Sequence, residues 1–361
     1  MGRNNLTQLL KTAFPECSGL GIVEDASEVE PLLRYFVISG PQGPRWLVPQ
    51  DPRLGLPVIS SWRPYGVQSR IKWFALLRLY QLGQLRQMPN VTSIGMSACR
   101  SSLPQHNDER SNLYPVIYVG TEGKHRKLVS ILVSAKTYQP MLVEKIPLTA
   151  LAKQSIANEY DTLVQLKDME GVAPIPLGYN VKNGCTTQQI VTGKLSSSKF
   201  LSHYPRYLEQ LGQNSLDHNH YFEALFRKNN ALSTSDDEYN LLPRIYDELS
   251  RLSKKTVIDP VRIHGDFAPW NIKIERDQVT ALDWEASETI GSPSYDMLYF
   301  SAIQNHLFSN KENLKLPALA HSNIRDENII RLSLIEMLLN QLIRDKANSF
   351  CQYLTRQLGW L

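Results

Sequence analysis

Cysteine is scarce in this sequence, with only four residues in a chain of 361. They stand far apart, at positions 17, 99, 185 and 351, without a CxxC pair or a cluster of cysteine with histidine. With this spacing, neither a zinc site nor a disulfide framework is expected. We predict four reduced and mostly buried thiols, as is usual for proteins of the cytosol.

Long apolar runs are also missing. The first residues lack the apolar stretch of a signal peptide, and Leu6 stands where the N-myristoylation pattern requires serine or threonine. The most apolar helical stretch, residues 73–82, is interrupted by Arg78 and Gln81 and is too short to cross a bilayer. The sequence therefore predicts a cytoplasmic protein without a transmembrane segment.

Neither sign of charge dominates the whole chain, which has 39 Lys and Arg against 35 Asp and Glu. A net charge of +4 does not indicate a nucleic-acid partner, and none is predicted. Residues 52–107 differ, because they contain seven Arg and Lys but no Asp or Glu. Such a stretch could bind phosphates, anionic lipid or an acidic partner. The commoner alternative is that these cations are hydrated or pair with carboxylates elsewhere in the fold.

Turn and strand signals organise the first 110 residues. Two strand-like runs, 34–39 and 45–49, flank the turn sequence GPQGP. A helix is predicted from about residue 69 to residue 86, because apolar residues recur there near a period of 3.6. Those residues are Ile71, Phe74, Leu77 and Leu82. Residues 101–113 are polar and rich in turn formers, which indicates a loop or linker.

The rest of the chain changes from strands to helices. A small sheet with one helix set into it is predicted first, and from about residue 195 onward the pattern is mainly helical except around residues 261–281. These patterns predict an α+β fold in three parts. They are an amino-terminal α/β region of unknown role at 1–110, a small β-rich lobe at 111–194 and a larger helical lobe at 195–361. The expected strands are 114–120, 127–133, 141–146, 173–179 and 187–192, with a helix at 148–166.

The most specific segment is HGDFAPWNI at residues 264–272, which is followed by LDWE at residues 282–285. Asp266, Asn271 and Asp283 supply two carboxylates and one amide. Magnesium prefers such oxygen ligands, and phosphoryl transfer needs cations to neutralise charge on the phosphate oxygens. A further carboxylate can orient an attacking hydroxyl and accept its proton.

These motifs resemble the catalytic and metal-binding segments of the aminoglycoside phosphotransferase and choline kinase family, which has a two-lobed protein-kinase-like fold. GSPSYDML at residues 291–298 is similar to a further segment of that family. The resemblance implies that Asp266 is the catalytic base and that Asn271 and Asp283 bind magnesium. It also implies that His264 braces the loop and that Asp296 holds the loop backbone. It covers roughly residues 115–345, about two-thirds of the chain.

The same resemblance implies an ATP-binding lysine paired with a helix glutamate in the small lobe. Lys145 ends a predicted strand, and Glu159 lies in the following helix. Asp161 is a rival partner, but it falls on another face of that helix. Gly193 follows the last small-lobe strand, where a hinge could hold the adenine.

The phosphate loop departs from the protein-kinase pattern. Only Gly120 and Gly123 stand where protein kinases have GxGxxG. They could form a shortened phosphate loop or a simple hairpin turn, and the sequence leaves both possibilities open.

The function implied is ATP- and Mg²⁺-dependent phosphoryl transfer to a hydroxyl or amine of a small molecule, such as an aminoglycoside, an amino alcohol or a sugar. Residues 197–255 and 300–361 would select the acceptor. Their acidic run 236–238 could receive a cationic acceptor or form a surface loop. Two alternatives are a kinase of cell-surface glycan biosynthesis, suggested by the basic amino-terminal region, and a catalytically silent nucleotide-binding scaffold. The oligomeric state and the choice between ATP and GTP stay open.

Overall fold

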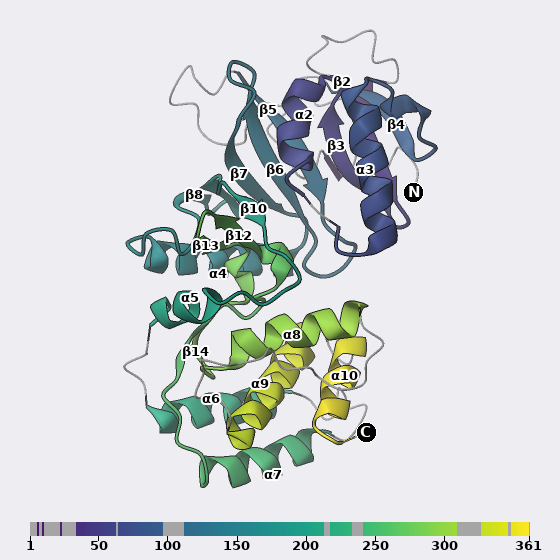
Figure 1. The fold of residues 1–361 in the computed structure, drawn as a ribbon. Helices are drawn as coiled ribbons and strands as arrows, with labels where there is room; N and C mark the ends of the chain where they lie inside the picture. Colours follow the sequence, from purple (N-terminus) through teal and green to yellow (C-terminus); the bar gives the residue numbers. More distant parts are fainter. Residues whose placement is uncertain are drawn as a thin grey trace. The chain divides into compact units, whose positions relative to one another are not determined.

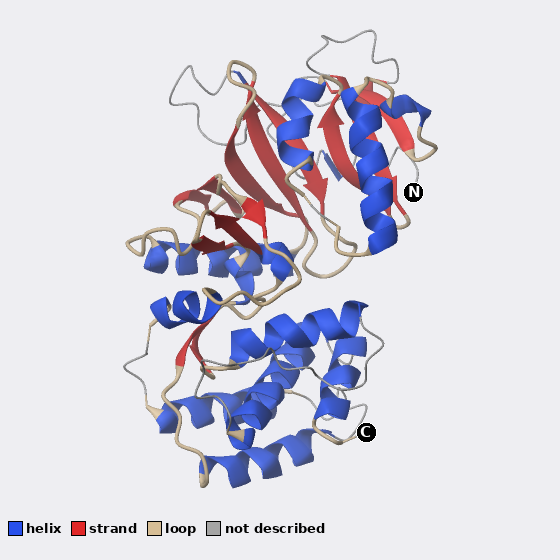
Figure 2. Cartoon of the chain, viewed as in Figure 1, coloured by secondary structure: helices blue, strands red, loops and turns tan. Residues whose placement is uncertain are grey.

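The chain divides into two compact units, which are described separately below. The computed structural model describes residues 6, 9–10, 22–23, 34–62, 64–96, 112–212, 217–232, 241–308, 326–345 and 348–360. Unit 1 comprises residues 1–169 and 173–194, and unit 2 comprises residues 170–172 and 195–361. Strands dominate unit 1 and helices dominate unit 2 (Figure 2), which confirms the predicted α+β class with a β-rich and a helical part.

Unit 1 is built on one antiparallel sheet. Nine strands of its described part follow the order β1-β4-β2-β3-β5-β6-β7-β9-β8. The strands are β1 (Ile22–Val23), β2 (Arg34–Gly40), β3 (Gly43–Pro49), β4 (Val91–Met96), β5 (Leu113–Val119), β6 (Lys127–Ser134), β7 (Pro140–Pro147), β8 (Pro176–Asn180) and β9 (Cys185–Gln189). The β2–β3 hairpin turns at Gly43, whose φ of 108° favours glycine.

The sheet continues without interruption across the predicted boundary at residue 110. Strand β3 pairs with β5, with Trp46 opposite Tyr118 and Leu47 opposite Ile117. The amino-terminal strands therefore extend the sheet that carries Lys145. The division into residues 1–110 and 111–194 stays a prediction about domains.

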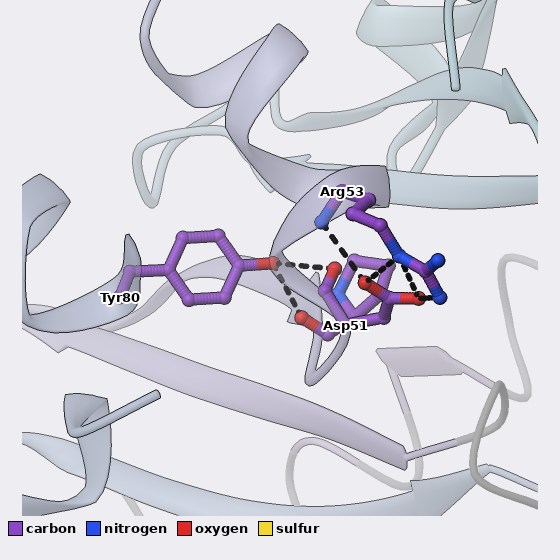
Figure 3. A network of polar contacts seen from close by, with 4 residues as sticks. Asp51, Arg53 and Tyr80 are labelled. Atoms are coloured by element: carbon purple, nitrogen blue, oxygen red, sulfur yellow. Dashed lines mark hydrogen bonds and ion pairs between the residues drawn. The ribbon is translucent and has the colours of Figure 1, made fainter. Parts of the chain in front are cut away.

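Helices α2 (Pro52–Ile59) and α3 (Val67–Gln81) lie side by side on one face of this sheet (Figure 1), and a short 3₁₀ turn follows at Leu85–Gln87. Asp51 caps α2 by accepting a hydrogen bond from the Arg53 backbone at 3.0 Å. The Tyr80 hydroxyl of α3 points at the carbonyl groups that precede α2 (Figure 3) and donates to that of Pro49. A Cβ on Gly55 would lie 2.0 Å from this hydroxyl, so the two helices can meet only at a glycine.

The orientation of α3 differs from the simplest expectation. Leu76 and Tyr80 are its buried residues against the sheet, at 5% and 0% exposure. Of the residues that predicted the helix, Ile71, Phe74 and Leu82 are exposed to solvent. The period of 3.6 predicted a helix here, but the helix ends at Gln81 and not near residue 86, and the buried stripe is a different one.

Two apolar clusters enclose the sheet of unit 1. One includes Trp46, Val48 and Val116 beneath α2 and α3. The other includes Leu47, Ile117 and Ile146. Helix α4 (Ala150–Leu166) starts at the N-cap Thr149, whose hydroxyl accepts from Ala152 at 3.1 Å, and packs against β7, β8 and β9.

Unit 2 is a helical unit with short strands. The chain enters it within β10 (Lys194–Leu195). Its helices are α5 (Tyr204–Gln210), α6 (His218–Ala231), α7 (Leu241–Ser253), α8 (Tyr295–Phe308), α9 (Glu327–Asp345) and α10 (Ser349–Gln357). Its other strands are β11 (Val261–Ile263), β12 (Ile272–Glu275), β13 (Gln278–Ala281) and β14 (Glu288–Gly291).

The packing of unit 2 positions two loops. Its core is formed by α6 to α10 around Leu249, Leu298 and Leu338. Strand β11 pairs with β14, and β12 pairs with β13. The loops that follow β11 and β13 are those with the HGDFAPWNI and LDWE motifs.

The remaining expectations concern thiols and membrane spans. Cys185 and Cys351 are buried and do not belong to a disulfide. Cys17 and Cys99 lie outside the described residues. Within the described ranges, every helix is too short or too polar to cross a membrane.

Candidate functional site

The loop between β11 and β12 brings Asp266 and Asn271 into direct contact. The Asn271 amide nitrogen donates to the Asp266 carboxylate at 2.9 Å and to the Asp266 backbone carbonyl at 3.0 Å. A 3₁₀ turn at Pro269–Asn271 folds the loop back, with the Asn271 N–H donating to the Ala268 carbonyl at 2.8 Å. Because the amide nitrogen faces Asp266, the amide oxygen is the atom of Asn271 that can ligate a cation.

Asp283 is placed beside this loop by the β12–β13 pair. Ile272 lies opposite Ala281 in that pair, and the Leu282 N–H donates to the Asn271 carbonyl at 2.7 Å. Asp283 adopts left-handed backbone angles, with φ 64° and ψ 61°. Such angles are uncommon outside glycine, and strain of this kind concentrates at functional sites.

The His264 ring ties the two loops together. Its Nδ1 accepts a hydrogen bond from the Asp266 backbone N–H at 3.2 Å, and its Nε2 lies 2.8 Å from the Leu282 carbonyl. One ring nitrogen must therefore accept and the other must donate, which fits only the neutral ring protonated at Nε2. The ring is fully buried. His264 thus links the residue before Asp283 to the backbone of Asp266.

Asp296 holds the start of the loop that contains Asp266. Its two carboxylate oxygens accept the backbone N–H groups of His264 at 2.7 Å and of Gly265 at 2.9 Å. Burial raises the pKa of Asp296 to about 7, and these two hydrogen bonds oppose the rise. Gly265 has φ +81°, and a Cβ there would lie 2.1 Å from the Ala286 carbonyl oxygen. The loop can take this path only with glycine at position 265.

The electrostatic surroundings of Asp266 suit a proton acceptor. Burial raises the pKa of this half-buried carboxyl to about 6, and the nearby charge of Asp283 adds to the rise. The charge of Arg344 and hydrogen bonds from Tyr299 and Asn271 act in the opposite direction. A carboxyl that titrates near neutral pH can take up a proton and release it again in each cycle.

Tyr299 and Arg344 are site residues that the sequence did not indicate. Tyr299 lies on α8 and is almost fully buried, and Arg344 lies in the last turn of α9. Burial opposes the charge of Arg344, yet the charge of Asp266 and its surroundings hold the pKa of Arg344 above its ordinary value. Neither residue belongs to a motif, so only the packing of α8 and α9 reveals them.

The donor set around Asp266 fits magnesium better than a transition metal. No three His, Cys, Asp or Glu side chains of the described chain come together as a metal site. The Asn271 amide oxygen and the carboxylates of Asp266 and Asp283 are all hard oxygen donors. Magnesium is commonly bound by one or two carboxylates together with phosphate oxygens of the substrate, and Asp283 can supply one carboxylate while Asp266 is left to accept a proton.

In unit 1, Lys145 and Glu159 form a buried ion pair. The Lys145 Nζ lies 2.7 Å from the Glu159 Oε1, with the side chains only 6% and 1% exposed. Lys145 comes from β7 and Glu159 from α4, as predicted, whereas Asp161 is exposed. Desolvating two charges is costly, so a buried pair of this kind is weak evidence for stability. The role of the pair in ATP binding stays a prediction.

The β5–β6 connection contains the two glycines of the candidate phosphate loop. The Gly120 N–H donates to the Lys127 carbonyl at 2.9 Å, and a Cβ on Gly120 would lie 2.7 Å from that oxygen. Gly123 has φ +156° with open space around it. Arg45 of β3 donates to Thr121 in this loop at 3.1 Å. The loop closes as a hairpin, and phosphate binding by it stays a prediction.

Gly193 lies between β9 and β10, one residue before the last residue that unit 1 contributes. Its φ of 93° favours glycine. Its role as a hinge that holds adenine stays a prediction. The acidic run 236–238, a candidate for acceptor binding, lies outside the described residues.

The predicted residues thus form two sets. Unit 2 brings together the residues of the HGDFAPWNI loop and the groups that contact it, which are His264, Asp266, Asn271, Asp283 and Asp296. Unit 1 contains the Lys145–Glu159 pair, the loop with Gly120 and Gly123, and Gly193, which lies next to the last residue of the unit.

No family model matches the chain, and no curated protein matches its sequence. Several solved structures are similar to it. A choline kinase from Streptococcus pneumoniae is 12% identical with a TM-score of 0.46, covering 67% of this chain and 92% of its own. A macrolide 2'-phosphotransferase from Brachybacterium faecium is 13% identical with a TM-score of 0.43 over 67% and 92%. An ADP-bound aminoglycoside phosphotransferase is 12% identical with a TM-score of 0.40 over 68% and 93%.

These neighbours belong to the group of small-molecule kinases that the motifs suggested. With TM-scores below 0.5, the likenesses carry no weight in the functional argument. That argument rests on the geometry of the two loops in unit 2.

Proposed function

We propose that the chain is an ATP-dependent phosphotransferase that acts on a hydroxyl or amine of a small molecule. The observation that carries this proposal is the constellation in unit 2. Asp266 contacts Asn271, Asp283 follows the neighbouring strand, and separate groups hold each loop in place. A loop whose Asp and Asn merely cap turns would not need a buried carboxylate and a buried imidazole devoted to its backbone.

Asp266 is the group placed to accept a proton. In the proposed reaction the acceptor hydroxyl or amine attacks the γ-phosphorus of ATP, and the bond to the β,γ-bridging oxygen breaks to release ADP. The proton of the acceptor passes to the Asp266 carboxylate. With a pKa of about 6, Asp266 is largely ionised at neutral pH and ready to accept it.

Asn271 and Asp283 would hold magnesium through their side-chain oxygens. The bound ion supplies neutralisation of the charge on the phosphate oxygens. His264 keeps these ligands in register with Asp266, because its ring joins the backbones of Leu282 and Asp266. The chain's own contribution is therefore orientation and charge, which is what this class of reaction requires.

Lys145 would bind the α- and β-phosphates of ATP. Glu159 keeps the lysine charged and fixed, because its carboxylate lies within 2.7 Å of the ammonium group. A buried lysine without such a partner would lose its proton readily and could not bind an anion well. Of the roles proposed here, the role of Lys145 is the one that a nucleotide-binding assay tests most directly.

The experiment combines nucleotide binding with an acceptor panel. ATP with Mg²⁺ should raise the melting temperature of the protein, and the increase should be lost in Lys145→Met. Label from the γ-phosphate should then appear on one member of a panel of aminoglycosides, amino alcohols and sugars. If ATP binds but no acceptor is labelled, a silent nucleotide-binding protein is favoured. If ATP does not bind, the proposal is wrong.

A further inference from the structure

Helix α3 of unit 1 is apolar on two opposite faces. Leu76 and Tyr80 face the sheet and are buried. On the other side, Ile71, Phe74 and Leu82 are 67%, 60% and 67% exposed. A helix that packs on one side normally presents polar residues on the other. Exposed apolar residues grouped on one helix are typical of a surface that another body covers.

The exposed apolar face of α3 is flanked only by positive charge. Lys72 and Arg78 are exposed, and the Arg78 guanidinium lies over the Phe74 ring at 5.3 Å from its centroid. No Asp or Glu occurs from residue 52 to residue 107. Within the described part of the chain, neither Lys72 nor Arg78 forms an ion pair. A partner with negative charge would complement both cations.

We propose that α3 docks unit 1 on the surface of an anionic lipid bilayer. Ile71, Phe74 and Leu82 would enter the headgroup region, and Lys72 and Arg78 would contact the lipid phosphates. Long basic side chains can bury their stems beside apolar residues while the charged ends reach phosphate. The helix lies beside α2 on one face of the sheet (Figure 1).

A second copy of the chain fits this face less well. A twofold contact through α3 would bring the exposed Arg78 and Lys72 of one copy against those of the other, and like charges in contact are destabilising. An acidic protein would complement the charges of Lys72 and Arg78. A specific protein partner, however, usually places a hydrogen-bond acceptor opposite each donor. A group of aliphatic and aromatic residues with Arg78 among them and Lys72 beside them needs only apolar depth and negative surface charge.

The test is cosedimentation of the full chain with lipid vesicles at low and high salt. Vesicles of equal parts phosphatidylglycerol and phosphatidylcholine should retain the protein at low salt, whereas phosphatidylcholine alone should retain little. Lys72→Gln and Arg78→Gln should each weaken partitioning about fivefold. Ile71→Ser with Phe74→Ser should weaken it about tenfold or more. All four side chains are exposed, so the fold should keep its melting temperature.

A matched control lies elsewhere in unit 1. Val181 is 76% exposed and is followed by the exposed Lys182 in the β8–β9 turn. Val181→Ser with Lys182→Gln should leave vesicle binding unchanged. Binding lost equally in the control and the α3 variants would overturn the proposal, as would a wild-type protein that stays in the supernatant with phosphatidylglycerol present. A dimer that Ile71→Ser with Phe74→Ser disperses, without vesicle binding, would assign the face to a second copy instead.

Discussion

Gly265→Ala is the substitution that most sharply tests the geometry of the catalytic loop. The new Cβ would start 2.1 Å from the Ala286 carbonyl oxygen, and the backbone there has φ +81°. The left-handed conformation alone costs about 1–2 kcal/mol for a residue with a side chain. Displacing a packed backbone carbonyl adds about 1–3 kcal/mol to this cost. We expect the free energy of unfolding to fall by about 2–5 kcal/mol in total.

Gly359→Ala provides the matched control in the same unit. Gly359 has φ +71°, but nothing lies within 4 Å of its would-be Cβ. This variant should lose only the conformational part, about 1–2 kcal/mol. Urea unfolding measures both losses. The difference between the two variants isolates the clash.

The same pair of variants reports on catalysis. Because position 265 adjoins Asp266, a shift of about 1 Å in the loop should lower kcat about a hundredfold. Gly359→Ala should keep wild-type kcat. Equal losses of stability in the two variants, or wild-type kcat in Gly265→Ala, would refute the argument that glycine is needed for this path of the loop.

Three further predictions concern charge. Lys145→Met should raise KM for ATP about 10- to 100-fold in steady-state kinetics. Adding Glu159→Leu should restore the stability measured by thermal unfolding without restoring KM. A KM restored by the second substitution would contradict the role of Lys145. Arg344→Gln should raise the pKa of Asp266, because the cation lowers it, so the acid limb of kcat/KM should move to higher pH; an unmoved limb would separate Arg344 from Asp266. Burial raises the pKa of Glu336 from 4.5 to about 7, so the folded state binds more protons than the unfolded state between these values and stability falls as pH rises through that window. Asp266 and Asp296, whose pKa values burial also raises, contribute to the same fall. Glu336→Gln should therefore make the fall shallower without abolishing it in urea unfolding at several pH values, and an unchanged slope would show that Glu336 does not contribute.

That Asp266 and Asn271 lie together could be predicted from sequence because the contact is local, whereas their role in catalysis stays a prediction. Asp266 and Asn271 are five residues apart in one loop, and a fixed motif states both their types and their spacing. The support from Asp296 was predicted from its motif, and its two backbone hydrogen bonds are present. The exact bonding of His264, which selects one ring tautomer, needed coordinates because it depends on the carbonyl of Leu282.

Residues that act across helices could not be predicted in the same way. Tyr299 and Arg344 reach Asp266 from α8 and α9. No sequence spacing relates them to the loop, because helix packing alone brings them there. The pairing of β3 with β5 was missed for a related reason, since the strands are separated by two helices, β4 and a long polar segment.

Helix α3 shows what a period of 3.6 in the sequence does not predict. Apolar residues occur on both of its faces, so the period located a helix but could not say which face is buried. Burial followed from contacts with the sheet, through Leu76 and Tyr80. The sequence shows that residues 52–107 contain no acidic residue, and the structure shows that the exposed apolar face of α3 belongs to this stretch.

The most direct test of the central claim compares wild type with Asp266→Asn in a single turnover. ATP labelled at the γ-phosphate is mixed with Mg²⁺ and the acceptor identified from the panel, and ATP affinity is measured separately by calorimetry. We expect that Asp266→Asn binds ATP as the wild type does but transfers the label about a hundredfold more slowly. Transfer at the wild-type rate in Asp266→Asn would contradict it.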